Sequence, residues 1–465
     1  MKRMKRTLAA LLAMTMLVPL ASCSGTGGGE SAPSSSGGVS SGTEPGAEEV
    51  ETYGGITITL CNAWGKDLTP GQNDETDRFI DRIAEVEEKY DVEFVYAKGP
   101  EEYYDNMVTT IMAGEPYGDL MFAFPSYFLD WVKAGAVKDL TDLGLSFEHP
   151  DLNPVAAVEG TIDGRVYGFN MDKAEVNSMM AFNKRLFEEA GLESPYDLIE
   201  RDEWTFATME EYAKKLTKTD ANGNNTQWGL STFDPPWLGV TMIYANNGKV
   251  VDFQSDGTAK FTMDEPNALE AMDLLNKMVN VDKSVLVTEA GEDWSTAVKA
   301  FTDGKVGMLR AEQWIIDCFN AWDMADDFGI VYFPKGPKAA DYVDDISSQA
   351  VYFVPSCVDD ERAKAAVTVY MALFSDLYPE MSEEEEAEMR FMAKCRDEES
   401  VQFMADVYNK GYTQSTQIGK AGLTDAMPEI FRELFEGKST PAAIVGEKKA
   451  SLQAMLDERF AFAAD

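Results

Sequence analysis

The residue types that most often perform chemistry are scarce in this chain. Its single histidine, His149, lies in the segment Phe147-Glu148-His149-Pro150-Asp151, which is typical of a turn. A Ser-His-Asp or Cys-His arrangement would require this histidine, and no nucleophile stands at a usable spacing from it. A metal site ligated by histidine would require it too. We therefore expect neither a histidine-based catalytic centre nor a metal site.

The remaining candidate chemical groups are also poorly spaced. The cysteines beyond Cys23 show no C-x-x-C spacing, which argues against a zinc module or a disulfide scaffold: Cys61, Cys318, Cys357 and Cys395. The segment 220–226 is superficially similar to a calcium loop, but it lacks the glycine at the sixth position, and Ser231 replaces the bidentate glutamate. We interpret it as a tight turn, and we expect no cofactor.

Cys23 is the one cysteine with a distinctive context. Four cations and an apolar run from Leu8 to Leu20 precede it, and the run is shorter than the roughly 20 residues of a spanning helix. The ending Leu20-Ala21-Ser22-Cys23 resembles the lipobox of bacterial lipoproteins, in which the cysteine carries the lipid. The alternative is an ordinary secretory signal with a chance cysteine. We expect export and a lipid anchor at Cys23 in the cell membrane, facing outward.

The charge of the chain restricts its partners. Removing residues 1–22 takes away four cations and no acid, so the formal net charge changes from −41 to −45. Such a surface repels nucleic acid and anionic lipid headgroups, which excludes nucleic-acid binding and leaves the N-terminal lipid as the membrane contact. Residues 24–52, rich in Ser and Gly, predict a flexible tether with a reach of roughly 30 Å.

After the tether, strand and helix patterns alternate. Ile56 to Leu60 is a β-branched run, Asp74 to Lys89 has helical spacing, and Val92 to Ala97 alternates like a strand. The strand-like segment Asp119 to Phe124 precedes a helical one, Tyr127 to Val132. This rhythm predicts an α/β fold with a mostly parallel sheet, whose ligands bind beyond the carboxyl ends of the strands. A second such region begins near Ser178, and the last third is rich in helices.

Three ordered motifs give the chain a family resemblance. The stretch 114–120, GEPYGDL, leads into AGAVKDLT; the segment DGRVYGF at 163–169 is followed by AFNKRLFEEAGL at 181–192; and FTDGKVGM at 301–308 is followed by Trp314. Together they resemble the family 1 extracellular solute-binding proteins of ABC importers. That resemblance implies a two-lobe periplasmic-binding-protein-like fold of type II, with discontinuous lobes, a hinge and a ligand cleft between them.

The resemblance also implies boundaries and partners. We expect strands to cross between lobes near 172–177 and 346–354, and a short third return near 412–418. The expected parts are a signal peptide at 1–22, the lipidated cysteine and tether at 23–52, lobe I at 53–172 plus about 350–412, and lobe II at 173–349 plus about 413–465. The implied partners are a small carbohydrate ligand and ABC permease subunits, with the binding protein itself a monomer.

The candidate ligand residues come from loops at expected strand ends. Sugar sites combine aromatic faces with amide, carboxylate and hydroxyl groups. By family position, the candidates for lobe I are Trp64, Lys66, Asp67, Ser126 and Tyr127; those for lobe II are Asp234, Trp237, Glu312, Trp314, Ser348 and Gln349. Glu312 stands where the family usually has glycine. Trp131, Trp204 and Trp294 are interpreted instead as packing residues.

Three functions remain open at this point. The first is capture of an extracellular carbohydrate for delivery to a permease, and the second is the same fold binding a polyol or a peptide. The third is a surface glycoside hydrolase, which needs two carboxylates about 5–10 Å apart around a sugar. Because no catalytic signature accompanies the 81 acidic residues, we expect a binding protein and not an enzyme.

Overall fold

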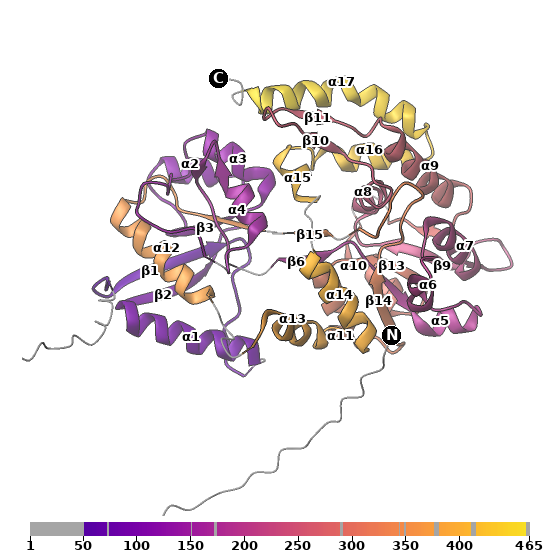
Figure 1. Ribbon diagram of the computed structural model, residues 1–465, viewed down its shortest axis with the longest axis horizontal. Helices are drawn as coiled ribbons and strands as arrows, with labels where there is room; N and C mark the ends of the chain where they lie inside the picture. The colour runs from indigo at the N-terminus through magenta and orange to yellow at the C-terminus, as the bar shows by residue number, and fades with distance from the viewer. Residues whose placement is uncertain are drawn as a thin grey trace, which may run out of the picture. The chain divides into compact units, whose positions relative to one another are not determined.

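A computed structural model describes residues 51–71, 74–149, 151–171, 174–288, 292–343, 345–347, 350–375, 381–410 and 415–461 (Figure 1). The predicted signal peptide, Cys23 and most of the tether lie outside these residues, as do Asp172, Ser348 and Gln349. Among the described helices, none has the length and apolar character needed to cross a membrane.

The first lobe is built around a four-stranded sheet in the order β16-β3-β1-β2. β1 pairs in parallel with β2 and β3, while β16 runs antiparallel to β3. Alternate residues of β1 face opposite sides, so Ile58 and Leu60 join one apolar core and Cys61 joins the other. The strands are β1 Ile56–Asn62, β2 Val92–Lys98, β3 Leu120–Ala123 and β16 Val351–Phe353.

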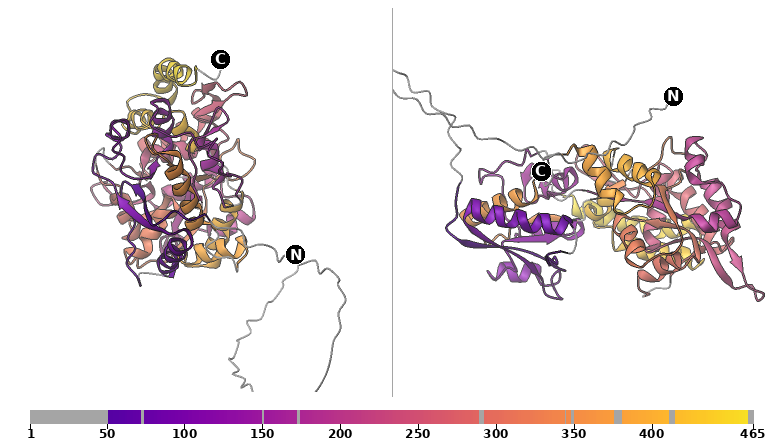
Figure 2. Two further views of the ribbon diagram at one scale, coloured as in Figure 1. Left: turned by 90° about the vertical axis from the view of Figure 1, so that its left-hand side faces the viewer. Right: turned by 90° about the horizontal axis from the view of Figure 1, so that it is seen from below.

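Helices cover both faces of this sheet. α1 and α12 pack against each other over the core that holds Leu60, and α2 and α3 supply residues to the core that holds Cys61 (Figures 1 and 2). The orange α12 lies among indigo and purple elements in Figure 1, so this lobe combines segments far apart in the sequence. The helices are α1 Asp74–Tyr90, α2 Met107–Met112, α3 Pro125–Lys133, α4 Pro154–Gly160 and α12 Asp360–Phe374; two short strands, β4 Thr161–Ile162 and β5 Arg165–Val166, follow α4.

The second lobe holds a six-stranded sheet with the path β12-β9-β13-β7-β14 and β8 beside β9. β9 pairs in parallel with β12 and β13, whereas β7 runs antiparallel to β13 and β14. The strands are β7 Met179–Asn183, β8 Lys218–Thr219, β9 Asn225–Thr232, β12 Val285–Leu286, β13 Val306–Ala311 and β14 Phe328–Tyr332; β10 Val251–Phe253 and β11 Ala259–Phe261 form a hairpin apart from this sheet.

The helices of this lobe also form two layers. Met308 of β13 faces a core shared with α7, α8, α9, α16 and α17, and Leu309 faces a core shared with α10, α11, α13 and α14. The helices are α5 Lys184–Glu189, α6 Pro195–Glu200, α7 Phe206–Leu216, α8 Pro235–Ala245, α9 Pro266–Asn280, α10 Ser295–Thr302, α11 Gln313–Ala321, α13 Glu383–Met392, α14 Glu398–Lys410, α15 Ser415–Lys420, α16 Ala426–Phe435 and α17 Pro441–Arg459.

Two of the expected crossing segments pair with each other. β6 Glu175–Asn177 and β15 Asp345–Ser347 form a short antiparallel ladder, with Asp345 opposite Asn177. The residue after β6, Ser178, has a φ of +54°, an unusual value for a residue with a side chain. Backbone of this kind at the junction of two lobes is suited to a hinge.

The structure differs from the expected boundary in the last third of the chain. Residues 350–412 were expected in lobe I, but α14 packs against β14, and Phe391 of α13 lies in the core of the second sheet. Lys394 also forms an ion pair with Asp317 of α11 at 2.6 Å. The apolar faces of these two helices match either lobe in sequence, so the pattern alone could not assign them.

Candidate functional site

The aromatic residues of lobe I gather at the carboxyl ends of β1 and β3. Because these strands are parallel, the loops that follow them meet at one edge of the sheet. Trp64 follows β1, and its ring lies 4.9 Å from that of Phe122 in β3. Trp64 is 55% exposed, while the side-chain oxygen of Asn62 accepts a hydrogen bond from the Trp64 backbone nitrogen at 3.2 Å. The tryptophan ring is therefore fixed at its base and open to solvent.

Tyr127 extends this aromatic surface. It lies in the first turn of α3, directly after the half-buried Ser126, and is 44% exposed. Its ring stacks on Tyr104 at 5.1 Å, and Tyr104 in turn stacks on Phe124 at 5.4 Å. The Tyr104 hydroxyl is buried and makes no hydrogen bond in the described structure. Trp131 is 5% exposed, so its interpretation as a packing residue is consistent with the structure.

The other two candidates of lobe I are oriented differently. The ammonium of Lys66 lies 4.3 Å from the centroid of the Phe79 ring, within cation–π range, and Phe79 belongs to the core. Asp67 accepts hydrogen bonds from the backbone nitrogen and hydroxyl of Thr69 at 3.0 and 2.7 Å, as in a turn. Lys66 and Asp67 are therefore each engaged in a local structural contact.

In lobe II the candidates follow the parallel strands β9 and β13. Asp234 caps α8, accepting a hydrogen bond from the Trp237 backbone nitrogen at 3.5 Å. Glu312 precedes α11, and its carboxylate accepts a hydrogen bond from the indole nitrogen of Trp314 at 2.8 Å. The ring of Phe233, which follows β9, meets Trp314 edge to face at 5.1 Å. The structure thus brings Asp234, Glu312 and Trp314 to one edge, while the half-buried Trp237 packs on the adjoining core.

A buried arginine that the sequence analysis missed links these groups. Arg310, 1% exposed, lies near the end of β13 with its Nη1 2.9 Å from the Glu312 carboxylate. Its Nε donates to the Thr241 hydroxyl at 3.2 Å, and its guanidinium lies 5.5 Å from the Phe233 ring centroid. A single charge inside the otherwise apolar strand β13 was the signal that could have identified it.

Two of the acidic side chains near this edge have raised pKa values. Burial raises the pKa of Asp234 to about 6, the nearby charge of Glu312 adds to the rise, and Arg310 opposes it. Burial likewise raises the pKa of Glu175 in β6, where Arg390 opposes the rise and Glu312 adds to it. With a pKa of about 6, the Asp234 carboxyl group can either accept or donate a hydrogen bond, which suits the recognition of hydroxyl groups.

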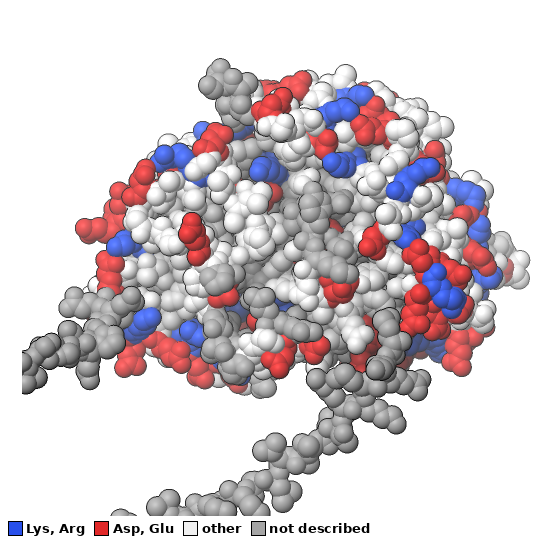
Figure 3. Space-filling view, viewed as in Figure 1, with Lys and Arg blue, Asp and Glu red and all other residues white. Residues whose placement is uncertain are grey.

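Two other parts of the described structure bear on the alternatives. Asp220 accepts hydrogen bonds from the backbone nitrogens of Asn222 and Asn224, both at 2.9 Å, as in the expected tight turn. The described residues contain no cluster of His, Cys, Asp or Glu arranged to hold a metal ion. On the face drawn in Figure 3, acidic and basic side chains are interspersed.

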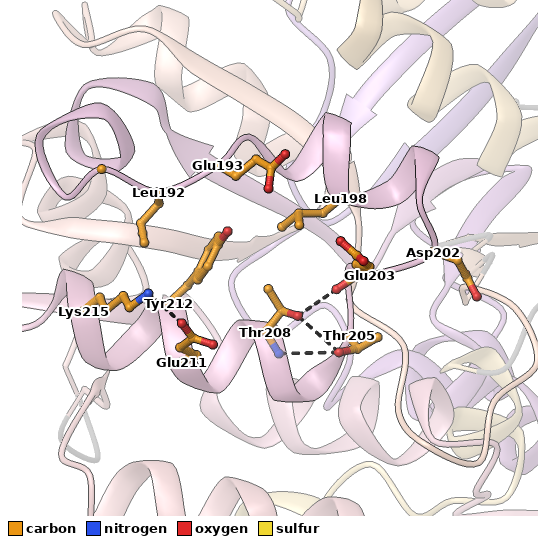
Figure 4. Close-up of a pocket in the computed structure, with 11 residues that line it drawn as sticks. Leu192, Glu193, Leu198, Asp202, Glu203, Thr205, Thr208, Glu211, Tyr212 and Lys215 are labelled. Atoms are coloured by element: carbon orange, nitrogen blue, oxygen red, sulfur yellow. Dashed lines mark hydrogen bonds and ion pairs between the residues drawn. The ribbon is translucent and has the colours of Figure 1, made fainter.

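A surface pocket of about 550 Å³ lies elsewhere on lobe II, around α6 and α7 (Figure 4). It contains none of the candidate ligand residues. Its charged groups are already paired, since Glu211 binds Lys215 at 2.6 Å and Glu203 binds Arg201 at 2.9 Å. Thr208 donates to the backbone oxygen of Glu203 at 2.7 Å (Figure 4). We therefore place the candidate site at the strand ends and not in this pocket.

Comparison with known proteins agrees with this architecture. A family model described as bacterial extracellular solute-binding protein matches residues 81–376. The chain belongs to this family. The membership among bacterial extracellular solute-binding proteins that the motifs indicated is confirmed, and the matching model is that of family 8. This solute-binding protein is accordingly not an enzyme. No curated protein matches its sequence.

Solved structures of distant proteins share its fold. An ABC substrate-binding protein from Listeria monocytogenes in complex with cycloalternan has a TM-score of 0.60 at 20% identity, covering 86% of this chain and 99% of that one. The GacH receptor of Streptomyces glaucescens, solved with acarbose, gives 0.63 at 17%, covering 87% and 99%. A Mycobacterium tuberculosis protein bound to glycerophosphocholine gives 0.61 at 15%, covering 88% and 100%. The predicted α/β periplasmic-binding-protein fold is confirmed.

Proposed function

We propose that this solute-binding protein captures an extracellular carbohydrate between its two lobes and delivers it to the permease of an ABC importer. The observation that carries the proposal is a set of exposed aromatic rings at the strand ends of lobe I together with a half-buried ring beside carboxylates at the strand ends of lobe II. Trp64 and Tyr127 supply rings in lobe I, and Trp314 lies beside Glu312 and Asp234 in lobe II. Sugars present an apolar ring face and polar hydroxyls, and both kinds of group are provided here.

The electrostatics favour a ligand without net negative charge. Asp234 and Glu175 each lie close enough to Glu312 for its charge to raise their pKa, and Arg310 is already engaged with Glu312. An anionic ligand would add repulsion to this acidic site, whereas neutral hydroxyls can donate hydrogen bonds to the carboxylates. Two of the structural neighbours are described with cycloalternan and acarbose, which supports a saccharide.

A non-sugar solute is the second candidate. The neighbour described with glycerophosphocholine has the same fold, and the aromatic rings and carboxylates of this chain also suit a cationic headgroup. The two candidates predict different ligands for the same residues. They are therefore best separated by direct binding.

A thermal-shift screen tests the proposal. The chain from residue 51 onward is mixed with mono- and oligosaccharides, polyols, peptides and glycerophosphocholine. A ligand that binds only the folded state raises Tm, and calorimetry then gives its Kd. Stabilisation by saccharides alone supports the proposal, whereas stabilisation by glycerophosphocholine or peptides alone overturns it. Release of reducing ends from bound oligosaccharides is measured in parallel and is expected to be absent.

A further inference from the structure

Trp294 was expected to be a packing residue, but the structure places it in the open. It directly precedes α10 and is 40% exposed. Its ring meets that of Trp314 at 5.0 Å and stacks on that of Trp322 at 5.8 Å. Trp204, by contrast, is fully buried, and its indole nitrogen donates to the Tyr332 backbone oxygen at 2.9 Å. Trp204 is therefore a packing residue, whereas the ring of Trp294 is partly open to solvent.

An exposed tryptophan fixed by two ring contacts is suited to bind a ligand. Its ring leaves apolar surface in water, and its orientation is already set, so little conformational entropy remains to be lost on binding. Polar groups lie alongside, since Asp293 accepts a hydrogen bond from the Ser295 backbone nitrogen at 2.8 Å and the ammonium of Lys299 lies 5.5 Å from the Trp322 ring centroid. Rings flanked by charged and polar groups match the surface of a saccharide.

The geometry of the two rings sets a lower limit on ligand size. The planes of Trp294 and Trp314 are inclined by 68° to each other. A single sugar ring, which is nearly flat, cannot lie face to face on both. A ligand that uses both tryptophans must therefore present two rings at different angles, joined by a flexible glycosidic bond.

We propose that the ligand site extends from Trp314 to Trp294 and binds an oligosaccharide of two or more sugar rings in preference to a monosaccharide. The inference rests on the proposed function, because it assumes a carbohydrate. It adds Trp294 to the site as the platform for the second ring. Trp322 stacks on Trp294 and holds its ring in place.

Calorimetry with saccharides of increasing length tests this inference. The first series is glucose, maltose, maltotriose and maltotetraose. The second and third are the β-1,4-linked oligomers of glucose and of xylose, each compared with its own monosaccharide. For the series that binds, wild-type affinity is expected to rise at least tenfold from one ring to three. Trp294→Ala is expected to reduce this gain in affinity at least fivefold and to leave the monosaccharide affinity within twofold of that of the wild type. Trp294→Phe, which keeps a flat ring, should retain part of the gain.

The controls separate the possible failures. Val281, 71% exposed and on a different helix end, gives the matched surface variant Val281→Ala, which should bind as wild type does. Equal Tm values for the variants exclude misfolding. If a series binds and Trp294→Ala matches wild type at every length, or weakens the monosaccharide equally, the extended site is wrong while the carbohydrate function stands. If no saccharide binds the wild type, both the function and the extended site are overturned.

Discussion

Single residues of lobe II combine a stacking surface with a hydrogen-bonding network. Arg310 contacts Glu312, and Glu312 accepts a hydrogen bond from Trp314, so one chain of contacts runs from the strand to the half-buried ring of Trp314. Each member orients the next. Such a chain holds a binding surface in place before the ligand arrives, which reduces the entropy lost on binding.

Removing an aromatic platform is expected to weaken binding without unfolding the protein. Trp314→Ala should raise the Kd for a saccharide from the screen at least tenfold, because large aromatic anchors carry much of the energy of an interface. Calorimetry gives the Kd, and circular dichroism with Tm serves as the control for folding. Unchanged affinity in this variant would remove Trp314 from the site.

Glu159 in α4 gives a prediction about pH. It is 7% exposed, and burial raises its pKa to about 7, while Lys420 opposes the rise. The folded state thus holds a proton that the unfolded state releases near pH 4.5. Its contribution to stability is fully present below pH 4.5 and is lost as pH rises through 7. Glu159→Gln should therefore stabilise the protein at pH 8 by roughly 1–3 kcal/mol and have little effect at pH 4.5.

Urea denaturation at both pH values measures this difference. The exposed Glu101 provides the control, since Glu101→Gln should change the free energy of unfolding little at either pH. An equal effect of Glu159→Gln at pH 8 and pH 4.5 would contradict the assignment.

At the level of elements, close packing of the helices on the second sheet positions the strand ends. Gly229 in β9 is pressed against α7, where an added Cβ would lie 2.0 Å from the backbone oxygen of Ala213. Backbone cannot move aside as a flexible side chain can. The contact fixes the height of α7 over β9, and β9 leads into Phe233 and Asp234.

Gly229→Ala is therefore expected to destabilise the fold by about 2 kcal/mol or more, as overpacking of a core does. Gly446 within α17 is the matched control, because an added Cβ there meets nothing within 4 Å. Gly446→Ala should be neutral or stabilising by up to about 1 kcal/mol, since alanine is the better helix former. Urea denaturation of both variants measures the effects, and similar values for the two would refute the packing argument.

At the scale of the whole molecule, we expect the ligand to bring the lobes together about the β6–β15 ladder. A ligand drives such a change only by binding the closed form more favourably, which requires contacts from both lobes, for example from Tyr127 and Trp314. Small-angle scattering with a saccharide from the screen should show a smaller radius of gyration at saturation. An unchanged radius would favour a rigid protein with a site on one lobe.

Membrane attachment is the second prediction at this scale. If Cys23 carries a lipid, wild-type protein expressed in a bacterium should remain in the membrane fraction after a carbonate wash. Cys23→Ala should appear in the medium or the soluble fraction, because the lipid is the only anchor we expect. Retention of the variant in the membrane would disprove the anchor.

The class of the protein and much of its local structure follow from the amino-acid sequence alone. The periodicity of Ile56 to Leu60 and Asp74 to Lys89 identified β1 and α1, because burial on one face dictates the spacing of apolar residues. Tyr104 shares the helical spacing of Met107, Val108 and Ile111 in the sequence, but α2 begins only at Met107, since the preceding residues form turns. Family motifs then predicted the fold and the loops that hold Trp64 and Trp314.

Which residues contact one another depends on the tertiary fold. Trp294 and Trp131 both read as packing residues in sequence, yet one is 40% exposed and the other 5%. Arg310 and Glu312 are two positions apart, but their link to Phe233 and Asp234 depends on the pairing of β13 with β9. The sequence pattern also left open which lobe α13 and α14 pack against. Local periodicity reports that a face is buried, whereas the partner of that face is set by contacts distant in sequence.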